Sequence, residues 1–316
     1  MKTAVVAIGG NAILRAGESG SKENQMKNLE MSCRYIAQMI ADGYDIVLTH
    51  GNGPQVGNIL MRYDIAKNEI PQMPLDVAVA ESQGQMGYMI QQALTNSLKS
   101  IGLEKCVVSI VTQVIVDRND PAFQNPTKPI GMYFSKEDAD VLILKKGWKM
   151  VEDKKRGGWR RVVPSPEPVD IVEKYAIRKL VFTGQHSPIV VIASGGGGIP
   201  VVLEGDTYSG VEAVIDKDLA SSVLASSIGE RLFIMLTDVN KVALDFGKPT
   251  QRWIDRMTVK EAEMHLAEGH FLAGSMAPKI EAAIRFLHKS GEEVIITSPE
   301  KLHEALAGKD GTHIVP

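Results

Sequence analysis

The stretch Thr3-Ala4-Val5-Val6-Ala7-Ile8-Gly9-Gly10-Asn11 lies at the start of the chain and decides its fold class. Residues 3–8 are apolar and rich in β-branched side chains, a composition that predicts a buried strand. Gly9 and Gly10 end this run and permit a tight turn into a loop. Apolar residues then recur every three or four places between positions 26 and 40, and Gly43 follows as a stop. The segment therefore predicts a strand, a glycine loop and a helix.

The same unit recurs along the chain. Further strands are predicted at residues 45–48, 106–111, 189–193 and 232–236. Helices are predicted after the loop at 49–55, at 75–99, at 171–180 and after Asp216-Lys217-Asp218, the last of them ending near Gly229. Thr258 with Glu261 forms a possible capping box for a later helix, and Ser298-Pro299 opens the last one. Strands that alternate with helices predict an α/β fold with a mostly parallel sheet covered on both faces.

Residues 118–168 interrupt this alternation. Six of the chain's fifteen prolines fall there, and the apolar periodicity lapses. Within the segment, residues 148–153 and 159–163 flank a short polar run with two glycines, which predicts a β-hairpin. We interpret the segment as an insertion that projects from the main body.

Bulk composition limits the class of protein and its partners. A chain of 316 residues with 44% apolar content can fold as one large α/β unit or as two lobes. The 35 basic residues are balanced by 38 acidic ones, so no global field favours nucleic acid or anionic lipid, and a small-molecule partner fits better. No apolar run approaches the length of a membrane span or a signal peptide. Two cysteines without paired spacing indicate a reducing cytoplasm.

Three glycine turns follow predicted strands, at residues 9–10, 51–53 and 195–198. Glycine lets the backbone approach a bound group, and amides at a helix start stabilise phosphate. A single such turn is more often plain topology, but three in one sheet favour a polyphosphate ligand. The sequence fits neither the Walker loop nor the dinucleotide fingerprint, and Asp245-Phe246-Gly247 reads as a turn that only imitates a protein-kinase motif.

Lysines supply the second indication. Phosphoryl transfer needs positive charge over the migrating group more than it needs a nucleophile. Lys217 lies between Asp216 and Asp218, and Lys279 follows a glycine-rich segment at a predicted helix start. Solvated surface lysines are the alternative interpretation. The sequence indicates no Ser-His-Asp arrangement, and its seven histidines lack the spacing of a zinc site. His50 either orients its loop or contacts substrate.

Seven motifs together, in order along nearly the whole chain, resemble those of the carbamate kinases of the amino-acid-kinase superfamily. They are Ala7-Ile8-Gly9-Gly10-Asn11-Ala12, residues 49–55, Asn125-Pro126-Thr127-Lys128-Pro129, residues 195–200, Asp216-Lys217-Asp218, Leu236-Thr237-Asp238-Val239 and Gly274-Ser275-Met276-Ala277-Pro278-Lys279. The third motif, with its insertion, is typical of carbamate kinases rather than of the wider superfamily. Ala277 departs from the family pattern, in which many relatives have glycine.

The resemblance implies a three-layer αβα sandwich with a small protruding insertion subdomain at 118–168. It implies an N-terminal lobe, 1–200, for carbamate or carbamoyl phosphate and a C-terminal lobe, 201–316, for ATP or ADP. It also implies Mg²⁺ held mainly by nucleotide phosphates with no side-chain ligand, a homodimer, and a place in arginine metabolism. The implied activity is reversible phosphoryl transfer between carbamoyl phosphate plus ADP and carbamate plus ATP.

The same resemblance implies roles for individual residues. Those implied to be catalytic are Lys217, Asp218, Lys279, Lys128 and Asn11. Those implied to bind the carbamoyl or carbamate group are Gly9, Gly10, Asn11, Gly51, Asn52, Gly53 and Lys128. Those implied to bind nucleotide are Gly195, Gly196, Gly197, Lys217, Thr237, Asp238, Val239, Met276, Pro278 and Lys279.

Two alternatives remain at this point. One is another kinase of the superfamily, acting on acetylglutamate, glutamate, aspartate or a nucleoside monophosphate, against which the insertion speaks. The other is a nucleotide-binding regulator without catalysis, against which the retained lysines speak. An ATP-forming assay with carbamoyl phosphate and ADP separates all three.

Overall fold

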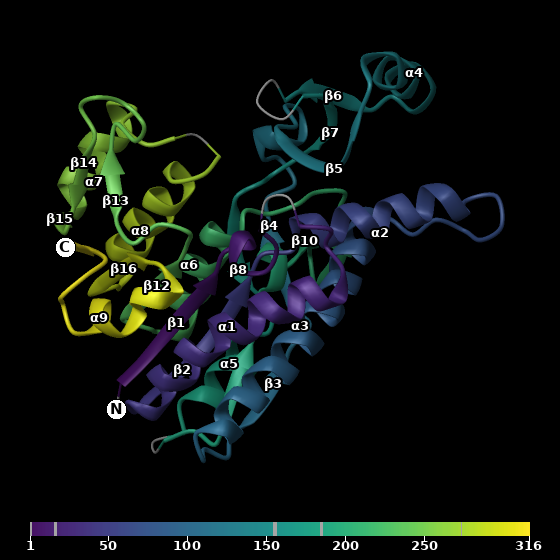
Figure 1. The fold of residues 1–316 in the computed structure, drawn as a ribbon. Helices are drawn as coiled ribbons and strands as arrows, with labels where there is room; N and C mark the ends of the chain where they lie inside the picture. Colours follow the sequence, from purple (N-terminus) through teal and green to yellow (C-terminus); the bar gives the residue numbers. More distant parts are fainter. Residues whose placement is uncertain (1, 16–17, 154–156, 184–185, 273) are drawn as a thin grey trace.

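The protein is described by a computed structural model that covers residues 2–15, 18–153, 157–183, 186–272 and 274–316. Its centre is an eight-stranded sheet, whose strands lie among the helices in Figure 1. The strand order is β15 (Arg256–Thr258), β17 (Thr312–Val315), β16 (Glu293–Thr297), β12 (Leu232–Leu236), β1 (Lys2–Ile8), β2 (Tyr44–His50), β9 (Ile189–Ile192) and β3 (Cys106–Ser109). Strands from β16 to β3 run parallel, and β17 runs antiparallel to β16.

Helices cover both faces of this sheet. One face packs against α1 (Lys22–Ala41), α3 (Leu75–Ser100) and α9 (Leu302–Leu306), and the other against α5 (Lys174–Val181), α6 (Lys217–Ile228), α7 (Val259–Ala267) and α8 (Ala277–Lys289). Strand β1 shows why: Val5 and Ala7 lie in the second of these cores, while Val6 and Ile8 lie in the first. Alternate side chains of a strand point to opposite faces, so a continuously apolar strand needs cover on both. The predicted three-layer αβα sandwich is confirmed.

A second, four-stranded sheet lies beside the main one. It consists of β11 (Thr207–Gly210), β10 (Ile199–Glu204), β4 (Gln113–Val116) and β8 (Pro168–Ile171) in that order. Predicted bounds differ from the structure in this sheet and in the main one. The loop expected at 49–55 is shorter, because β2 continues to His50 and the next helix begins at Gly53. The helix expected at 171–180 begins only at Lys174, because Ile171 is buried at the end of β8 and pairs with Val114 of β4. The strand expected at 106–111 ends at Ser109.

The insertion is an ordered subdomain that projects from the main body (Figure 1). It contains a three-stranded sheet in the order β5 (Lys128–Phe134), β7 (Trp159–Val163) and β6 (Lys149–Glu152), together with α4 (Lys136–Lys146). Pairing of β6 with β7 confirms the predicted hairpin. The sequence did not predict α4, because only its Ala139 is buried and no apolar stripe marks it. Its bounds come from the Ser135 N-cap and from Gly147, which has a φ of 64°.

The remaining elements are one helix, two short strands and several 3-10 helices, of which one lies in the insertion. They are α2 (Gly53–Ala66), β13 (Val242–Leu244), β14 (Arg252–Ile254) and the short 3-10 helices Gly10–Ala12, Pro121–Phe123, Gly195–Gly197 and Pro299–Lys301. The capping box of Thr258 and Glu261 is confirmed at the start of α7. Strand β1 of the predicted N-terminal lobe pairs with β12 of the predicted C-terminal lobe, so both lobes contribute strands to one sheet. The division into two lobes at residue 200 stays a prediction. Among the described residues, no helix combines the length and apolarity needed to cross a bilayer.

Candidate active site

A cavity of about 560 Å³ lies at the carboxyl ends of the central strands. Strands β12, β1, β2 and β9 are neighbours and parallel, so their carboxyl ends share one edge of the sheet. Thr237, Gly9 and Gly51 follow three of these ends directly and line the cavity. Ligands of open α/β sheets bind in this position, outside the carboxyl ends of the strands.

The first two glycine loops touch backbone to backbone. The Gly9 amide donates to the Leu236 carbonyl at 3.0 Å. A Cβ atom added at Gly9 would lie 2.8 Å from that carbonyl oxygen, and one added at Gly51 would lie 3.4 Å from the Gly10 nitrogen. A side chain at Gly9 would collide with the end of β12, so this glycine permits the close approach, whereas Gly51 lies in ordinary van der Waals contact with Gly10.

The third glycine loop, residues 195–197, lies against the second one. Gly196 has a φ of 65°, and a Cβ atom there would lie 1.9 Å from the Asn52 amide nitrogen. A Cβ atom at Gly195 would lie 2.4 Å from His50 Nε2. The three glycines expected at the nucleotide are all buried, and only Gly196 lines the cavity, so Gly195 and Gly197 do not contact the ligand site. Close packing against neighbouring segments accounts for these two glycines.

His50 is buried beneath these loops. Its Nδ1 lies 2.9 Å from the Gly51 carbonyl oxygen. Burial lowers the pKa of His50 to about 4, so the ring is neutral near pH 7. A neutral ring with Nδ1–H donating to Gly51 holds the loop in place. Of the two interpretations left open by the sequence, the loop-orienting one agrees with this geometry.

Three helices begin at the cavity, namely α2, α6 and α8. Asp216 is the N-cap of α6, and its Oδ1 accepts a hydrogen bond from the Asp218 amide at 2.9 Å. Pro54 and Pro278 occupy the first turns of α2 and α8, where proline is compatible with a helix start. Amides of a first helical turn lack intrahelical partners and carry partial positive charge. Their convergence makes the cavity an anion site.

A buried cluster of Lys217, Asp218 and Lys279, hereafter the lysine–aspartate cluster, lies at two of these helix starts. Lys217 Nζ donates to Asp218 Oδ1, and Lys279 Nζ donates to Asp218 Oδ2 at 2.9 Å. The side chain of Asp218 is 5% exposed, and those of the two lysines are 14% and 12% exposed. One carboxylate therefore holds two ammonium groups at the cavity wall, which leaves a net positive charge.

The pKa values of the cluster follow from burial and mutual charge. Burial raises the pKa of Asp218, but the charges of Lys217 and Lys279 outweigh it and hold that pKa below its ordinary range. Burial lowers the pKa of Lys217, an effect that Lys279 reinforces and Asp218 opposes. For Lys279, burial lowers the pKa, yet its interactions with Asp218 outweigh burial and the net shift is upward.

Lys128 reaches the cavity from the insertion. It lies at the start of β5, and its Nζ donates to Asp216 Oδ2 at 2.7 Å. Its side chain is 35% exposed, so this pair is far more open to water than the lysine–aspartate cluster. Sequence reasoning did not assign a role to Asp216, although its place just before α6 marked it as an N-cap. It missed Lys241, and it gave no site role to Ser275 of the seventh motif or to Phe246, which it assigned to a turn; all three line the cavity.

Most of the expected site residues meet in this cavity. Those that line it are Gly9, Gly10, Gly51, Asn52, Gly53, Lys128, Gly196, Lys217, Asp218, Thr237, Asp238, Val239, Met276, Pro278 and Lys279. The backbone of Asn11 lies in the 3-10 helix beside Gly10, and its side chain lies outside the described part of the structure.

Known proteins share this fold and sequence over nearly the full chain. The amino acid kinase family model matches residues 2–298. The carbamate kinase of Pyrococcus furiosus is 53% identical over 100% of this chain and 99% of its own length. The carbamate kinase of Thermococcus kodakarensis is 52% identical over 100% of this chain and 99% of its own length. The structure of carbamate kinase from Giardia lamblia bound to AMP-PNP superposes with a TM-score of 0.91, at 43% identity and over 99% of this chain and 98% of that one. The chain therefore belongs to the amino acid kinase family and, within it, to the carbamate kinases, which are phosphoryl-transferring enzymes.

Proposed function

We propose that the cavity transfers a phosphoryl group directly between carbamoyl phosphate and the terminal phosphate of ADP. A β-phosphate oxygen of ADP forms a bond to phosphorus while the bond from phosphorus to the carbamoyl oxygen breaks. The products are ATP and carbamate, and the transfer step itself needs no proton. The observation that carries this proposal is the lysine–aspartate cluster, which supplies buried positive charge where three helix starts meet.

The carbamoyl or carbamate group would lie at the glycine loops on the β1 and β2 side. Gly9, Gly10, Gly51, Asn52 and Gly53 line the cavity there, and Gly196 packs on Asn52. Backbone amides of these loops suit a small anionic group because they donate hydrogen bonds without adding side-chain bulk. Asn11, whose loop adjoins Gly10, is proposed to contribute from the same side.

The nucleotide would lie on the other side of the cavity. Thr237, Asp238, Val239, Met276 and Pro278 line that side, together with the aromatic ring of Phe246. The related carbamate kinase from Giardia lamblia binds AMP-PNP, a nucleotide analogue, which supports ATP or ADP as the ligand of this chain.

Lys217 and Lys279 are proposed to stabilise the charge that spreads over the migrating phosphoryl group. Asp218 holds both ammonium groups in place, which favours rapid transfer because the charges need no rearrangement. A role for Asp218 as a general base is unnecessary, since carbamate is already an anion. Lys128 would bring a further cation from the insertion toward the acceptor.

Mg²⁺ is proposed to enter with the nucleotide. The carboxylates of Asp216 and Asp218 are engaged by lysines, and the Asp238 carboxylate accepts from Thr237 Oγ1 at 3.1 Å. Oxygen atoms of the nucleotide phosphates are therefore the fitting ligands, in keeping with the preference of Mg²⁺ for phosphate and water. Bound there, the ion would neutralise part of the phosphate charge during transfer.

An assay of ATP formation from carbamoyl phosphate and ADP tests the proposal. We expect saturable, Mg²⁺-dependent ATP synthesis, and ADP formation when carbamate replaces carbamoyl phosphate with ATP present. Acetylglutamate, glutamate, aspartate and UMP, each offered with ATP, serve as the competing acceptors. Faster turnover of one of these would assign the chain to another superfamily activity, and nucleotide binding without any turnover would identify a regulator.

A dimeric assembly, a cytoplasmic location and a metabolic pathway are also proposed for the enzyme. The resemblance supports a homodimer, and Ile65, Ile70 and Met73 near the end of α2 are apolar residues exposed in the single chain. Cys33 and Cys106 are free thiols, which agrees with a cytoplasmic enzyme. Arginine metabolism is the pathway that the resemblance suggests.

A further inference from the structure

We propose that His265, Glu268 and His270, hereafter the histidine–glutamate cluster, bind a divalent transition-metal ion, with Zn²⁺ as the best fit. The cluster lies at the end of α7, and none of its residues lines the catalytic cavity. This site goes beyond the phosphoryl-transfer activity. The spacing of the histidines along the sequence gave no indication of it.

The end of α7 brings the three residues together. Gly269 has a φ of 74°, its amide donates to the Leu266 carbonyl at 3.1 Å, and the His270 amide donates to the His265 carbonyl at 3.1 Å. These two bonds define a Schellman motif, in which the residues five positions apart come into side-chain contact. That contact is usually apolar, but here it joins two imidazole rings whose centroids are 5.4 Å apart.

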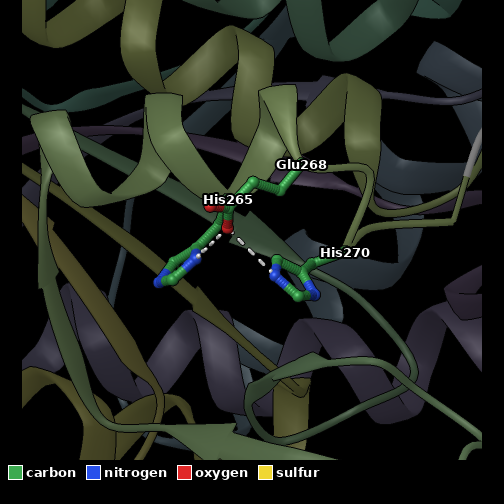
Figure 2. A group of neighbouring side chains, drawn as sticks. All are labelled: His265, Glu268 and His270. Atoms are coloured by element: carbon green, nitrogen blue, oxygen red, sulfur yellow. Dashed lines mark hydrogen bonds and ion pairs between the residues drawn. The ribbon is translucent and has the colours of Figure 1, made fainter.

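The donor atoms already lie near the separations of a metal site. Glu268 Oε2 is 3.1 Å from His270 Nε2 and 3.6 Å from His265 Nδ1, and the three ligand atoms all lie within 4.8 Å of one another. Figure 2 shows the Glu268 carboxylate between the two rings, with a nitrogen of each ring directed at it. Tetrahedral Zn²⁺ with bonds of about 2.0–2.1 Å places its ligands roughly 3.3–3.5 Å apart. Small side-chain rotations would close the difference.

His265 leaves one of its polar atoms without a partner. Its Nδ1 is buried and has no hydrogen-bond partner in the described part of the structure. The contact with Glu268 at 3.6 Å is too long for a hydrogen bond. Buried polar atoms normally have a partner, because leaving one unpaired costs free energy. A metal ion between the ring and the carboxylate supplies that partner.

Asp245 orients the second histidine. His270 Nδ1 lies 3.1 Å from Asp245 Oδ1, so the ring donates its Nδ1–H to that carboxylate. His270 Nε2 lies 3.1 Å from Glu268 Oε2, so this nitrogen faces the carboxylate with which it would share the ion. A carboxylate behind a metal-binding histidine has this same orienting role in known zinc sites.

The ligand set selects the ion. Two imidazole nitrogens and one carboxylate oxygen, with a fourth position open to water, suit tetrahedral Zn²⁺. Mg²⁺ and Ca²⁺ prefer oxygen ligands alone, so this site differs from the one proposed for Mg²⁺ on the nucleotide. Its Asp245 partner directly precedes Phe246, which lines the catalytic cavity. A bound ion would therefore fix the end of α7 to the segment that forms the nucleotide side of that cavity.

Titration of chelator-treated, nucleotide-free protein with ZnCl₂ in a calorimeter tests the proposal. We expect one Zn²⁺ per chain. We expect His265→Ala and His270→Ala each to weaken binding by about 10-fold or more, and Asp245→Asn to weaken it by about 10-fold through the ring that it orients. His288→Ala is the matched control, because His288 contacts Glu263 in the same part of the fold but lies outside the cluster. That variant should bind Zn²⁺ as the wild type does.

Two further measurements distinguish loss of the metal site from loss of folding. Co²⁺ should give the intense visible absorption of a four-coordinate ion in the wild type and lose it in Glu268→Gln, a change that keeps the shape of the side chain. Zn²⁺ should raise the melting temperature of the wild type more than that of Glu268→Gln. Absence of saturable Zn²⁺ binding by the wild type, or equal affinity in folded His265→Ala and His270→Ala, would overturn the proposal.

Discussion

Two lysine–aspartate contacts at the start of α6 hold positive charge in very different ways. The lysine–aspartate cluster is almost completely buried and ties α6 to α8 of the main body. The Lys128–Asp216 pair ties α6 to the projecting insertion and is partly open to water. Charges fixed in a mostly buried site act more strongly because water screens them less, whereas a pair more open to water contributes less. The cluster is therefore suited to stabilising a transition state, and the pair to admitting a substrate.

The largest effect should come from removing a cation of the cluster. We expect Lys217→Ala and Lys279→Ala each to lower kcat about 100-fold or more, because each deletes charge stabilisation made in the transition state. Steady-state kinetics on folded variants measures this. Lys289→Ala, at the exposed far end of α8, is the control and should keep wild-type turnover. Wild-type turnover in either cluster variant would show that the cluster is only structural.

Asp218→Asn should act next most strongly. Asparagine keeps the shape but loses the charge that holds both lysines, so we expect kcat to fall about 10- to 100-fold. The affinity for ADP, measured by calorimetry, should change less than kcat. Loss of ADP affinity with an unchanged kcat would mean that Asp218 serves nucleotide binding instead of charge placement.

The same variant should change the pH dependence of stability. The pKa of Asp218 is lower in the folded protein than its ordinary value of 3.8. Its ionised form thus stabilises the fold above about pH 4, and this contribution declines as the pH falls toward the folded-state pKa. Removing one partner of a buried ion pair costs about 3–5 kcal/mol. In urea unfolding we expect the wild type to exceed Asp218→Asn in stability from pH 7 to about pH 5, with the difference shrinking below about pH 4.

Lys128→Ala should have a smaller and more selective effect. We expect KM for carbamoyl phosphate to rise by about 10-fold and kcat to fall, while ADP binding stays nearly constant, because Lys128 is proposed to face the acceptor and not the nucleotide. Lys149→Ala is the matched control in the same subdomain, since Lys149 binds the Gln124 carbonyl instead. A loss confined to ADP affinity would contradict the proposed place of Lys128.

The smallest effect should come from Asp216→Asn. Asparagine still caps α6 through its side-chain oxygen, but it no longer neutralises Lys128. Exposed ion pairs are worth about 0.2–1 kcal/mol, so we expect KM for carbamoyl phosphate to fall by no more than about 5-fold. A rise in KM would indicate that Asp216 orients Lys128 toward the substrate and does not compete with it.

Local pattern predicted the elements that carry the site better than it predicted the insertion. The apolar run of β1 and the caps at Gly43 and Thr258 are local features, and the predicted strand, helix stop and capping box are confirmed. Helix α4 was not predicted, because its bounds depend on the capping residues at its ends and only one of its side chains is buried, which leaves no apolar pattern in the sequence. Ile171 was assigned to a helix because its pairing with Val114 depends on a strand far away in the sequence, a contact that no local periodicity reveals.

By itself the sequence determined which residues were available for chemistry: the glycine loops after the strands, the lysines at helix starts and the αβα order. These follow from backbone freedom and side-chain period, both of which are local. Only the tertiary structure decided which of them meet. It placed two lysines on one buried Asp218, paired Lys128 with Asp216, buried Gly195 and Gly197 behind Gly196, and folded two histidines onto Glu268. These contacts depend on how helices and loops from distant positions in the sequence pack around one sheet. Desolvation and charge act through space and not along the chain, so no local pattern reveals them.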